Sequence, residues 1–109
     1  MADKKILIEK ELDKVSGGAY IGNIDDKEKL DKLTFGEKLI VETSLGKDLA
    51  IATYEGSYIK SRGEYYVKVK ITEMIVSEIY PNTDLYGTKI TTGAIVYLEA
   101  YCLDYYENR

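Results

Sequence analysis

Two adjacent glycines, Gly17 and Gly18, end the charged segment ELDKVSGG and are the residues whose types and spacing first point to chemistry. A helix C-cap requires only one glycine, which supplies the left-handed backbone conformation there. Two glycines in a row also leave the backbone without side chains, so that a narrow peptidase cleft can close around it. We interpret the bond between Gly18 and Ala19 as a candidate cleavage site, with a helix cap as the alternative.

Chemistry by the chain itself has little support in the sequence. Cys102 is the only cysteine, and there is no histidine to act as its base. Histidine is also the commonest metal ligand. We expect Cys102 to pack on the apolar face of a strand as a small hydrophobic residue. The acidic residues lack the spacing of a calcium loop, and the glycines lack that of a phosphate-binding loop. The sequence predicts no enzyme, no metal site and no cofactor.

The composition changes at the glycines. Residues 1–18 hold four lysines, four acidic residues and no aromatic residue, whereas all eleven tyrosines and the one phenylalanine follow Gly18. The net charge of -4 disfavours nucleic acid, which requires clustered basic residues. No apolar run is long enough to span a bilayer or to form a secretory signal, so neither stable membrane insertion nor Sec-type export is expected.

A short amphipathic helix is predicted in the first segment, beginning after Asp3 as its N-cap. Ile8, Leu12 and Val15 follow one another at spacings of four and three residues and form one apolar stripe. A helix of about 13 residues with so narrow a stripe is marginal when free. We expect it to form against the groove of a partner protein.

Residues 7–18, LIEKELDKVSGG, resemble the double-glycine leader of bacteriocin-type peptides, which peptidase-containing ABC transporters export. The pattern of that family is approximately L-S-x-x-E-L-x-x-V/I-x-G-G. Ile8 stands where the family usually has serine. The other pattern positions match here, and they are Leu7, Glu11, Leu12, Val15, Gly17 and Gly18.

This resemblance implies a function for both parts of the chain. The cysteine peptidase domain of the transporter would cut after Gly18 and release a cargo that begins at Ala19, made in the bacterial cytoplasm and exported to the extracellular space. The catalytic cysteine and histidine would belong to the transporter. The cargo would be a bacteriocin-like or signalling polypeptide whose target the sequence does not identify. The residues expected to dock on the peptidase domain are Leu7, Ile8, Glu11, Leu12 and Val15.

Beyond the glycines we distinguish a charged spacer, residues 19–36, from a β-rich domain, residues 37–109. The spacer could form a short helix over residues 25–33, with Leu30 and Leu33 facing inward. Residues 65–71 alternate between apolar and polar side chains, as in a half-buried strand, and the phase then slips near residues 72–74, which predicts a bulge or corner. Glycine turns are expected in YEGSY (54–58) and SRGE (61–64).

One long strand is predicted for residues 94–106, with Cys102 on its apolar face and Tyr97, Tyr101 and Tyr105 together on the other face. Those tyrosines could form a binding platform, although tyrosine is also an ordinary strand residue. In all, we expect five or six antiparallel strands in a small barrel or sandwich. The alternative to a transporter cargo is a cytosolic β-barrel binding module with an N-terminal docking helix and no processing.

Overall fold

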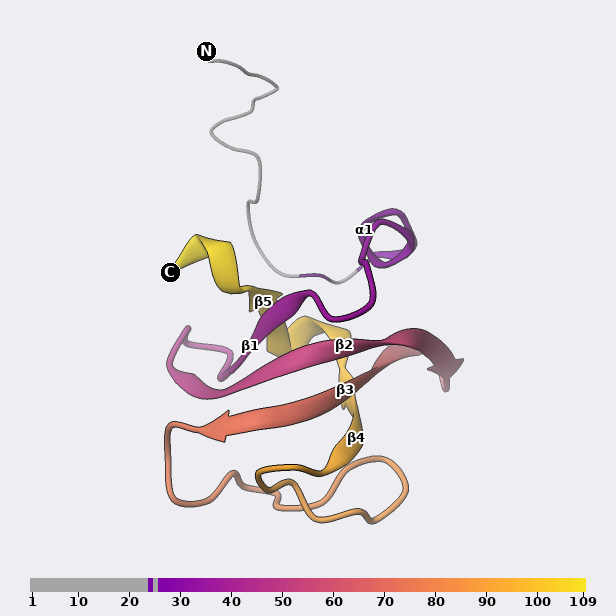
Figure 1. Ribbon diagram of the computed structural model, residues 1–109. Coiled ribbons are helices and arrows are strands. Elements are labelled where there is room, and N and C mark those ends of the chain that lie inside the picture. The colour runs from indigo at the N-terminus through magenta and orange to yellow at the C-terminus, as the bar shows by residue number, and fades with distance from the viewer. Residues whose placement is uncertain (1–23, 25) are drawn as a thin grey trace.

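The computed structural model describes residue 24 and residues 26–109, and the predicted leader lies outside this part of the chain. The elements are mostly strands (Figure 1). In chain order they are α1 (Lys27–Asp31), β1 (Lys38–Glu42), β2 (Asp48–Ser61), β3 (Glu64–Met74), β4 (Ile95–Glu99), the 3₁₀ turn η1 (Ala100–Cys102), β5 (Leu103–Tyr105) and the 3₁₀ turn η2 (Tyr106–Asn108).

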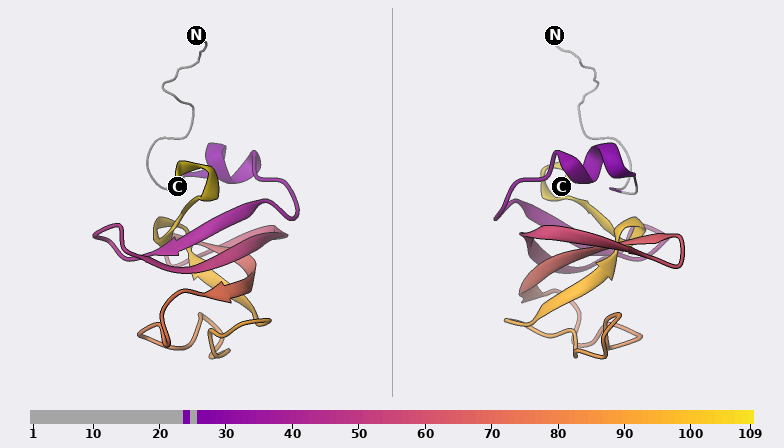
Figure 2. Two further views of the ribbon diagram at one scale, coloured as in Figure 1. Left: turned by 60° about the vertical axis from the view of Figure 1, so that its left-hand side comes forward. Right: turned by 90° about the vertical axis from the view of Figure 1, so that its right-hand side faces the viewer.

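The five strands form one antiparallel sheet in the order β4-β3-β2-β1-β5. β4 and β5 are therefore the two edges, yet only the three residues of η1 join them along the chain. The sheet must coil strongly to bring its edges so close together, and the two views in Figure 2 show this coiling. Among the described strands, β4 does not pair with β5. The prediction of a mainly β fold with five or six antiparallel strands is confirmed with five, but they form one sheet that is not closed into the predicted barrel.

Of the two predicted glycine turns in this region, one is confirmed and one is wrong. The β2–β3 hairpin turns at Arg62 and Gly63, whose φ angles of 53° and 81° are those of a two-residue hairpin loop. Gly56, by contrast, lies inside β2 with a φ of 94°. The register with β3 shifts between Tyr54 and Tyr58, so the segment around Gly56 is a bulge in a long strand and not a hairpin turn.

The alternation predicted for β3 is confirmed. Val67, Val69 and Ile71 are fully buried in the core. The phase slip is also present, because Ile51 pairs with Glu73 while the next residue of β2 pairs with Ile71. This leaves Thr72 as an extra residue, and its hydroxyl donates a hydrogen bond to the carbonyl oxygen of Ile51 at 3.0 Å. The bulge turns Met74 toward the core, which explains the apolar residue at that position.

The predicted single strand over residues 94–106 is wrong, because η1 interrupts it. Three residues in 3₁₀ geometry break the two-residue period of side-chain orientation. Leu103 and Tyr105 consequently face the core, where they are 0% and 7% exposed. Cys102 lies in the turn itself and is only half-buried, so its predicted place on the apolar face of a strand is wrong.

The short helix in the spacer is confirmed as α1. The carboxylate of Asp26 accepts a hydrogen bond from the backbone N–H of Lys29 at 2.8 Å, which caps the first turn. Leu30 and Leu33 are buried with Ile24 in the same core as the sheet. Figure 2 places α1 at one end of the sheet and the loop between β3 and β4 at the other.

Both edge strands contact loop segments that limit access to their backbone groups. At β4, the N–H of Tyr97 donates to the carboxylate of Asp84 at 2.8 Å, and the carbonyl of Tyr97 accepts from Leu85 N–H at 3.5 Å. At β5, the carbonyl of Leu103 accepts from the N–H of Ile24 at 3.3 Å. Covered edges disfavour strand-to-strand association between copies of the chain.

Candidate functional site

The residues that the sequence identifies as docking or cleavage sites all lie outside the described residues. This is true of the five docking residues and of the cleavage segment alike. The full set is Leu7, Ile8, Glu11, Leu12, Val15, Gly17, Gly18 and Ala19.

Within the described residues, a cavity of about 410 Å³ lies between the end of β1, β4, η1 and the loop of residues 75–94. Its apolar wall includes Leu49, Ile79, Ile90 and Leu98, which the curvature of the sheet and the long loop bring together. This volume is in the range of small-ligand pockets. The loop adds Tyr80, which is 96% exposed, at the mouth.

The loop that forms one side of this cavity is organised by Asp84. Its carboxylate accepts hydrogen bonds at 2.8 Å from the backbone N–H groups of Tyr86, Thr88 and Tyr97. The first two contacts hold a tight turn, and the third ties that turn to β4. Asp84 is therefore a positioning residue whose charge is already satisfied by backbone donors.

Two other acidic residues line the cavity, Glu42 and Glu99. Glu42 is bonded to the guanidinium of Arg109 at 2.7 Å. Glu99 accepts a hydrogen bond from the hydroxyl of Tyr101, and this bond, with burial and the charge of Glu99, raises the pKa of Tyr101 to about 12. Tyr101 therefore stays protonated and donates to Glu99 at all ordinary pH values.

Cys102 also lines the cavity, but as a weak nucleophile. Burial, followed by the negative charges of Glu99 and Glu42, raises the pKa of its thiol to about 11. Only the thiolate is strongly nucleophilic, so at neutral pH the reactive fraction is very small. The sequence also has no histidine that could act as a base for this thiol.

The three tyrosines that were expected on one face of a strand, and that could have formed a platform, lie in different surroundings because η1 interrupts that strand. Tyr97 is half-buried on β4 and packs edge-on against Tyr86 at 5.2 Å between ring centroids. Tyr101 is exposed on η1, and Tyr105 is in the core. A platform requires the rings on one face, and here they do not share one.

Sequence reasoning missed a cluster of charges around Arg109. The Arg109 guanidinium contacts Glu42 on β1 at 2.7 Å, Asp48 at the start of β2 at 2.8 Å and Asp104 on β5 at 2.8 Å. The hydrogen bond to Asp48 contributes most to raising the pKa of Arg109, followed by those to Asp104 and Glu42. The partners lie far apart in sequence, so no local pattern could have indicated this cluster.

Metal-binding clusters and membrane-spanning helices are both absent from the described residues. Residues 24 and 26–109 contain no group of three or more cysteine, aspartate or glutamate side chains arranged to hold a metal ion. In the same part of the chain, no helix is both long and apolar enough to cross a membrane.

Comparison of the chain with known proteins found no matching family model, no matching curated protein and no matching solved structure.

Proposed function

We propose that this chain is the precursor of an exported polypeptide, in which residues 1–18 are a leader and the segment from Ala19 onward is the cargo. The leader binds the cysteine peptidase domain of an ABC exporter, which cuts after Gly18 and then translocates the cargo. The observation that carries the proposal is the motif LIEKELDKVSGG at residues 7–18, placed immediately before an abrupt change in composition.

The position of the motif relative to the fold supports this division. The first described core residue is Ile24, which is fully buried, and every described helix and strand follows it. A cut between Gly18 and Ala19 would therefore remove none of the described elements. A cleavage site inside a strand would instead disrupt the sheet.

The docking energy should be modest. Leu7, Ile8, Leu12 and Val15 would bury aliphatic surface against the peptidase domain, and each fully buried side chain contributes about 1.5–3 kcal/mol before ordering costs. Glu11 would pair with a basic or polar group of the partner. Gly17 and Gly18 would lie in the cleft, where a side chain larger than hydrogen would obstruct the peptidase.

The experiment is to incubate the full chain with the cysteine peptidase domain of an ABC exporter that cuts double-glycine leaders and to measure intact masses. We expect one product beginning at Ala19. Gly18→Leu should block cleavage while leaving binding of the peptidase domain nearly unchanged. Normal processing of this variant would contradict the assignment of the cleavage site.

A matched pair of aliphatic substitutions tests docking separately from cleavage. Leu12→Ala removes one residue of the predicted stripe, whereas Ile6→Ala shortens a residue outside it. We expect Leu12→Ala to weaken binding of the peptidase domain about tenfold or more, by the cost of losing buried aliphatic surface. Equal effects of the two substitutions, or an uncut chain beside a peptidase that is active on another substrate, would reject the leader.

A further inference from the structure

We propose that the cavity beneath the β3–β4 loop binds an arginine side chain of a partner peptide, with an aliphatic neighbour of that arginine packed on the cavity wall. This inference concerns what the folded domain recognises. It goes beyond the proposed export of the chain and does not depend on whether the leader is cut.

The size and surface of the cavity favour a side chain or two and not a whole folded element. Its volume of about 410 Å³ is near the lower end of the range for small-ligand pockets. Leu49, Ile79 and Ile90 offer apolar surface in its wall. An aliphatic side chain that fills this part of the cavity would lose contact with water at no polar cost.

The charges in the cavity select a cation. Among the described residues that line it, every ionised side chain is acidic and none is lysine or arginine. Glu42 already contacts Arg109, and Asp84 is satisfied by backbone donors. Glu99 forms no ion pair with another described residue, and it raises the pKa of the neighbouring Tyr101 hydroxyl, which therefore stays neutral. Glu99 is therefore the anionic group that an incoming cation would meet.

The aromatic side chains beside Glu99 favour arginine over lysine. Tyr66 pairs with Glu99 across β3 and β4, and both Tyr66 and Tyr97 line the cavity. A guanidinium group stacks on tyrosine rings and forms two parallel hydrogen bonds to a carboxylate, whereas an ammonium group is a more strongly hydrated point charge. A carboxylate next to two tyrosines matches the planar cation better.

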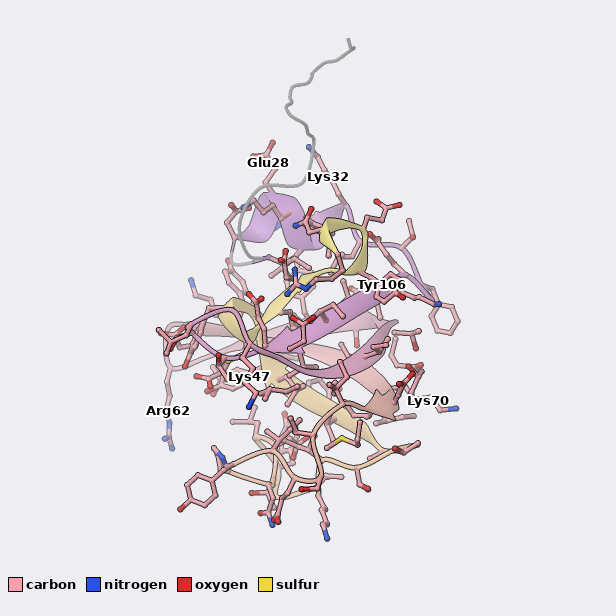
Figure 3. All side chains as sticks on the ribbon, turned by 90° about the vertical axis from the view of Figure 1, so that its left-hand side faces the viewer. Glu28, Lys32, Lys47, Arg62, Lys70 and Tyr106 are labelled. Carbon is pink, nitrogen blue, oxygen red and sulfur yellow. The ribbon has the colours of Figure 1, made fainter. Side chains whose placement is uncertain are left out.

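The partner is therefore a peptide segment that carries arginine next to an aliphatic residue. Lys68 is opposite Tyr97 in the sheet but does not line the cavity. The basic side chains of Lys47, Arg62 and Lys70 project from the surface in Figure 3. Within residues 24 and 26–109, no lysine or arginine lines the site.

The test is to titrate the ¹⁵N-labelled full chain with acetyl-Leu-Arg-amide and to follow the amide signals of Tyr66, Tyr97 and Glu99. Acetyl-Leu-Gln-amide and acetyl-Leu-Lys-amide are the matched probes. We expect the arginine probe to bind with a dissociation constant on the order of 1 mM, because the loss of translational and side-chain freedom offsets much of what two side chains gain. The glutamine probe should bind about tenfold more weakly, and the lysine probe should fall between the two.

Variants of the chain make the result specific to the cavity. Glu99→Gln should lower the affinity for the arginine probe about tenfold and leave the affinity for the glutamine probe unchanged. Glu73→Gln removes an exposed carboxylate on β3 outside the cavity and should have no effect. Tyr66→Leu should weaken the arginine probe more than the glutamine probe. A thermal melt of each variant establishes that it folds.

Several outcomes would overturn the proposal. One is the absence of shifts at these residues up to the solubility limit of the arginine probe. Another is equal affinity for the arginine and glutamine probes, or an equal response of Glu99→Gln and Glu73→Gln. If a full chain in which Lys4, Lys5, Lys10 and Lys14 are replaced by glutamine binds the probe much more tightly than wild type, the occupant of the cavity is the chain's own first segment and not a partner.

Discussion

Substitution of Arg109 by glutamine removes the cation that joins three strands. Its guanidinium contacts Glu42 on β1, Asp48 on β2 and Asp104 on β5, at distances of 2.7–2.8 Å. β5 is only three residues long and pairs with β1 alone among the described strands, so this edge of the sheet has few other contacts. We expect Arg109→Gln to destabilise that edge first.

The size of the loss depends on the exposure of each partner. The side chain of Asp48 is 33% exposed, so its pair should contribute about 0.5 kcal/mol, as surface pairs do. The side chains of Glu42 and Asp104 are only 9% and 11% exposed. Removing the partner of a charged group that is so little exposed costs more stability, because water cannot replace the lost hydrogen bond. Asp104 keeps its contacts with Asn108 and with the N–H of Tyr105, which limits the cost. We expect a total loss of about 2–3 kcal/mol.

A loss of this size is measurable by urea unfolding, followed by tyrosine fluorescence and by circular dichroism. For a domain of 60–100 residues it corresponds to a fall of about 10–20 °C in Tm. Arg109→Lys keeps the charge but cannot contact all three carboxylates at once. It should lower the free energy of unfolding by about half as much as Arg109→Gln. Lys47→Gln removes an exposed cation and serves as the control. The raised pKa of Arg109 means that the guanidinium stays charged at neutral and alkaline pH, and this contribution to stability is lost only as the pH rises above the arginine range.

The reasoning would be refuted if Arg109→Gln unfolded within about 0.5 kcal/mol of wild type, the usual range for surface substitutions. It would also be refuted if Arg109→Gln and Lys47→Gln lowered the free energy of unfolding equally. A double-mutant cycle with Asp48→Asn separates the exposed pair from the two buried pairs. If the coupling energy between Arg109 and Asp48 accounted for the whole loss in Arg109→Gln, the two buried carboxylates would gain no stability from Arg109.

Three further predictions concern other parts of the fold. Cys102, whose thiol pKa is raised from 9.0 to about 11, should react with iodoacetamide at pH 8 about a hundredfold more slowly than in the urea-unfolded chain, and equal rates would contradict the burial argument. The folded state favours the protonated thiol. The contribution of Cys102 to the free energy of unfolding is therefore fully present below pH 9 and is lost as the pH rises toward 11. Hydrogen bonds with Lys27 and Tyr58 lower the pKa of Asp31. The ionised carboxylate should therefore stabilise the folded chain above the ordinary aspartate pKa, and this stabilisation should be lost as the pH falls through the lowered pKa. The measurement is hydrogen exchange of α1 relative to the intrinsic exchange rate at each pH: protection should fall in acid, and Asp31→Asn should abolish this pH dependence. Gly56→Ala should cost about 1 kcal/mol or more in urea unfolding, because its φ of 94° is strained for any side chain, while Ser57→Ala should change little.

Local patterns in the sequence were sufficient for several elements. The alternation in β3 depends on the two-residue period of a strand, which any half-buried strand must show. The bulge at Thr72 and the turn at Arg62 and Gly63 were predictable for the same reason, because a phase slip and a two-residue glycine turn are properties of neighbouring residues. The helix α1 was predictable from Leu30 and Leu33 at a spacing of three.

Other features could not be read from neighbouring residues. A glycine marks a position that needs an unusual φ, but Gly56 and Gly63 have similar φ angles in a bulge and in a turn respectively. Which of the two forms depends on whether the partner strand continues alongside. Likewise, residues 94–106 alternate like one strand, yet η1 divides them because the chain must pass from one edge of the coiled sheet to the other.

The sequence by itself determined the change of composition at Gly18, the β-rich character of the chain beyond it and the faces of β3. Each of these depends on residues that are adjacent or nearly adjacent. Only the tertiary structure decided that the sheet stays open, that Arg109 meets carboxylates from β1, β2 and β5, and that Glu99 lies beside Tyr66 in a cavity. The physical reason is that these contacts arise from the curvature of the sheet, which is set by packing between segments far apart in the chain.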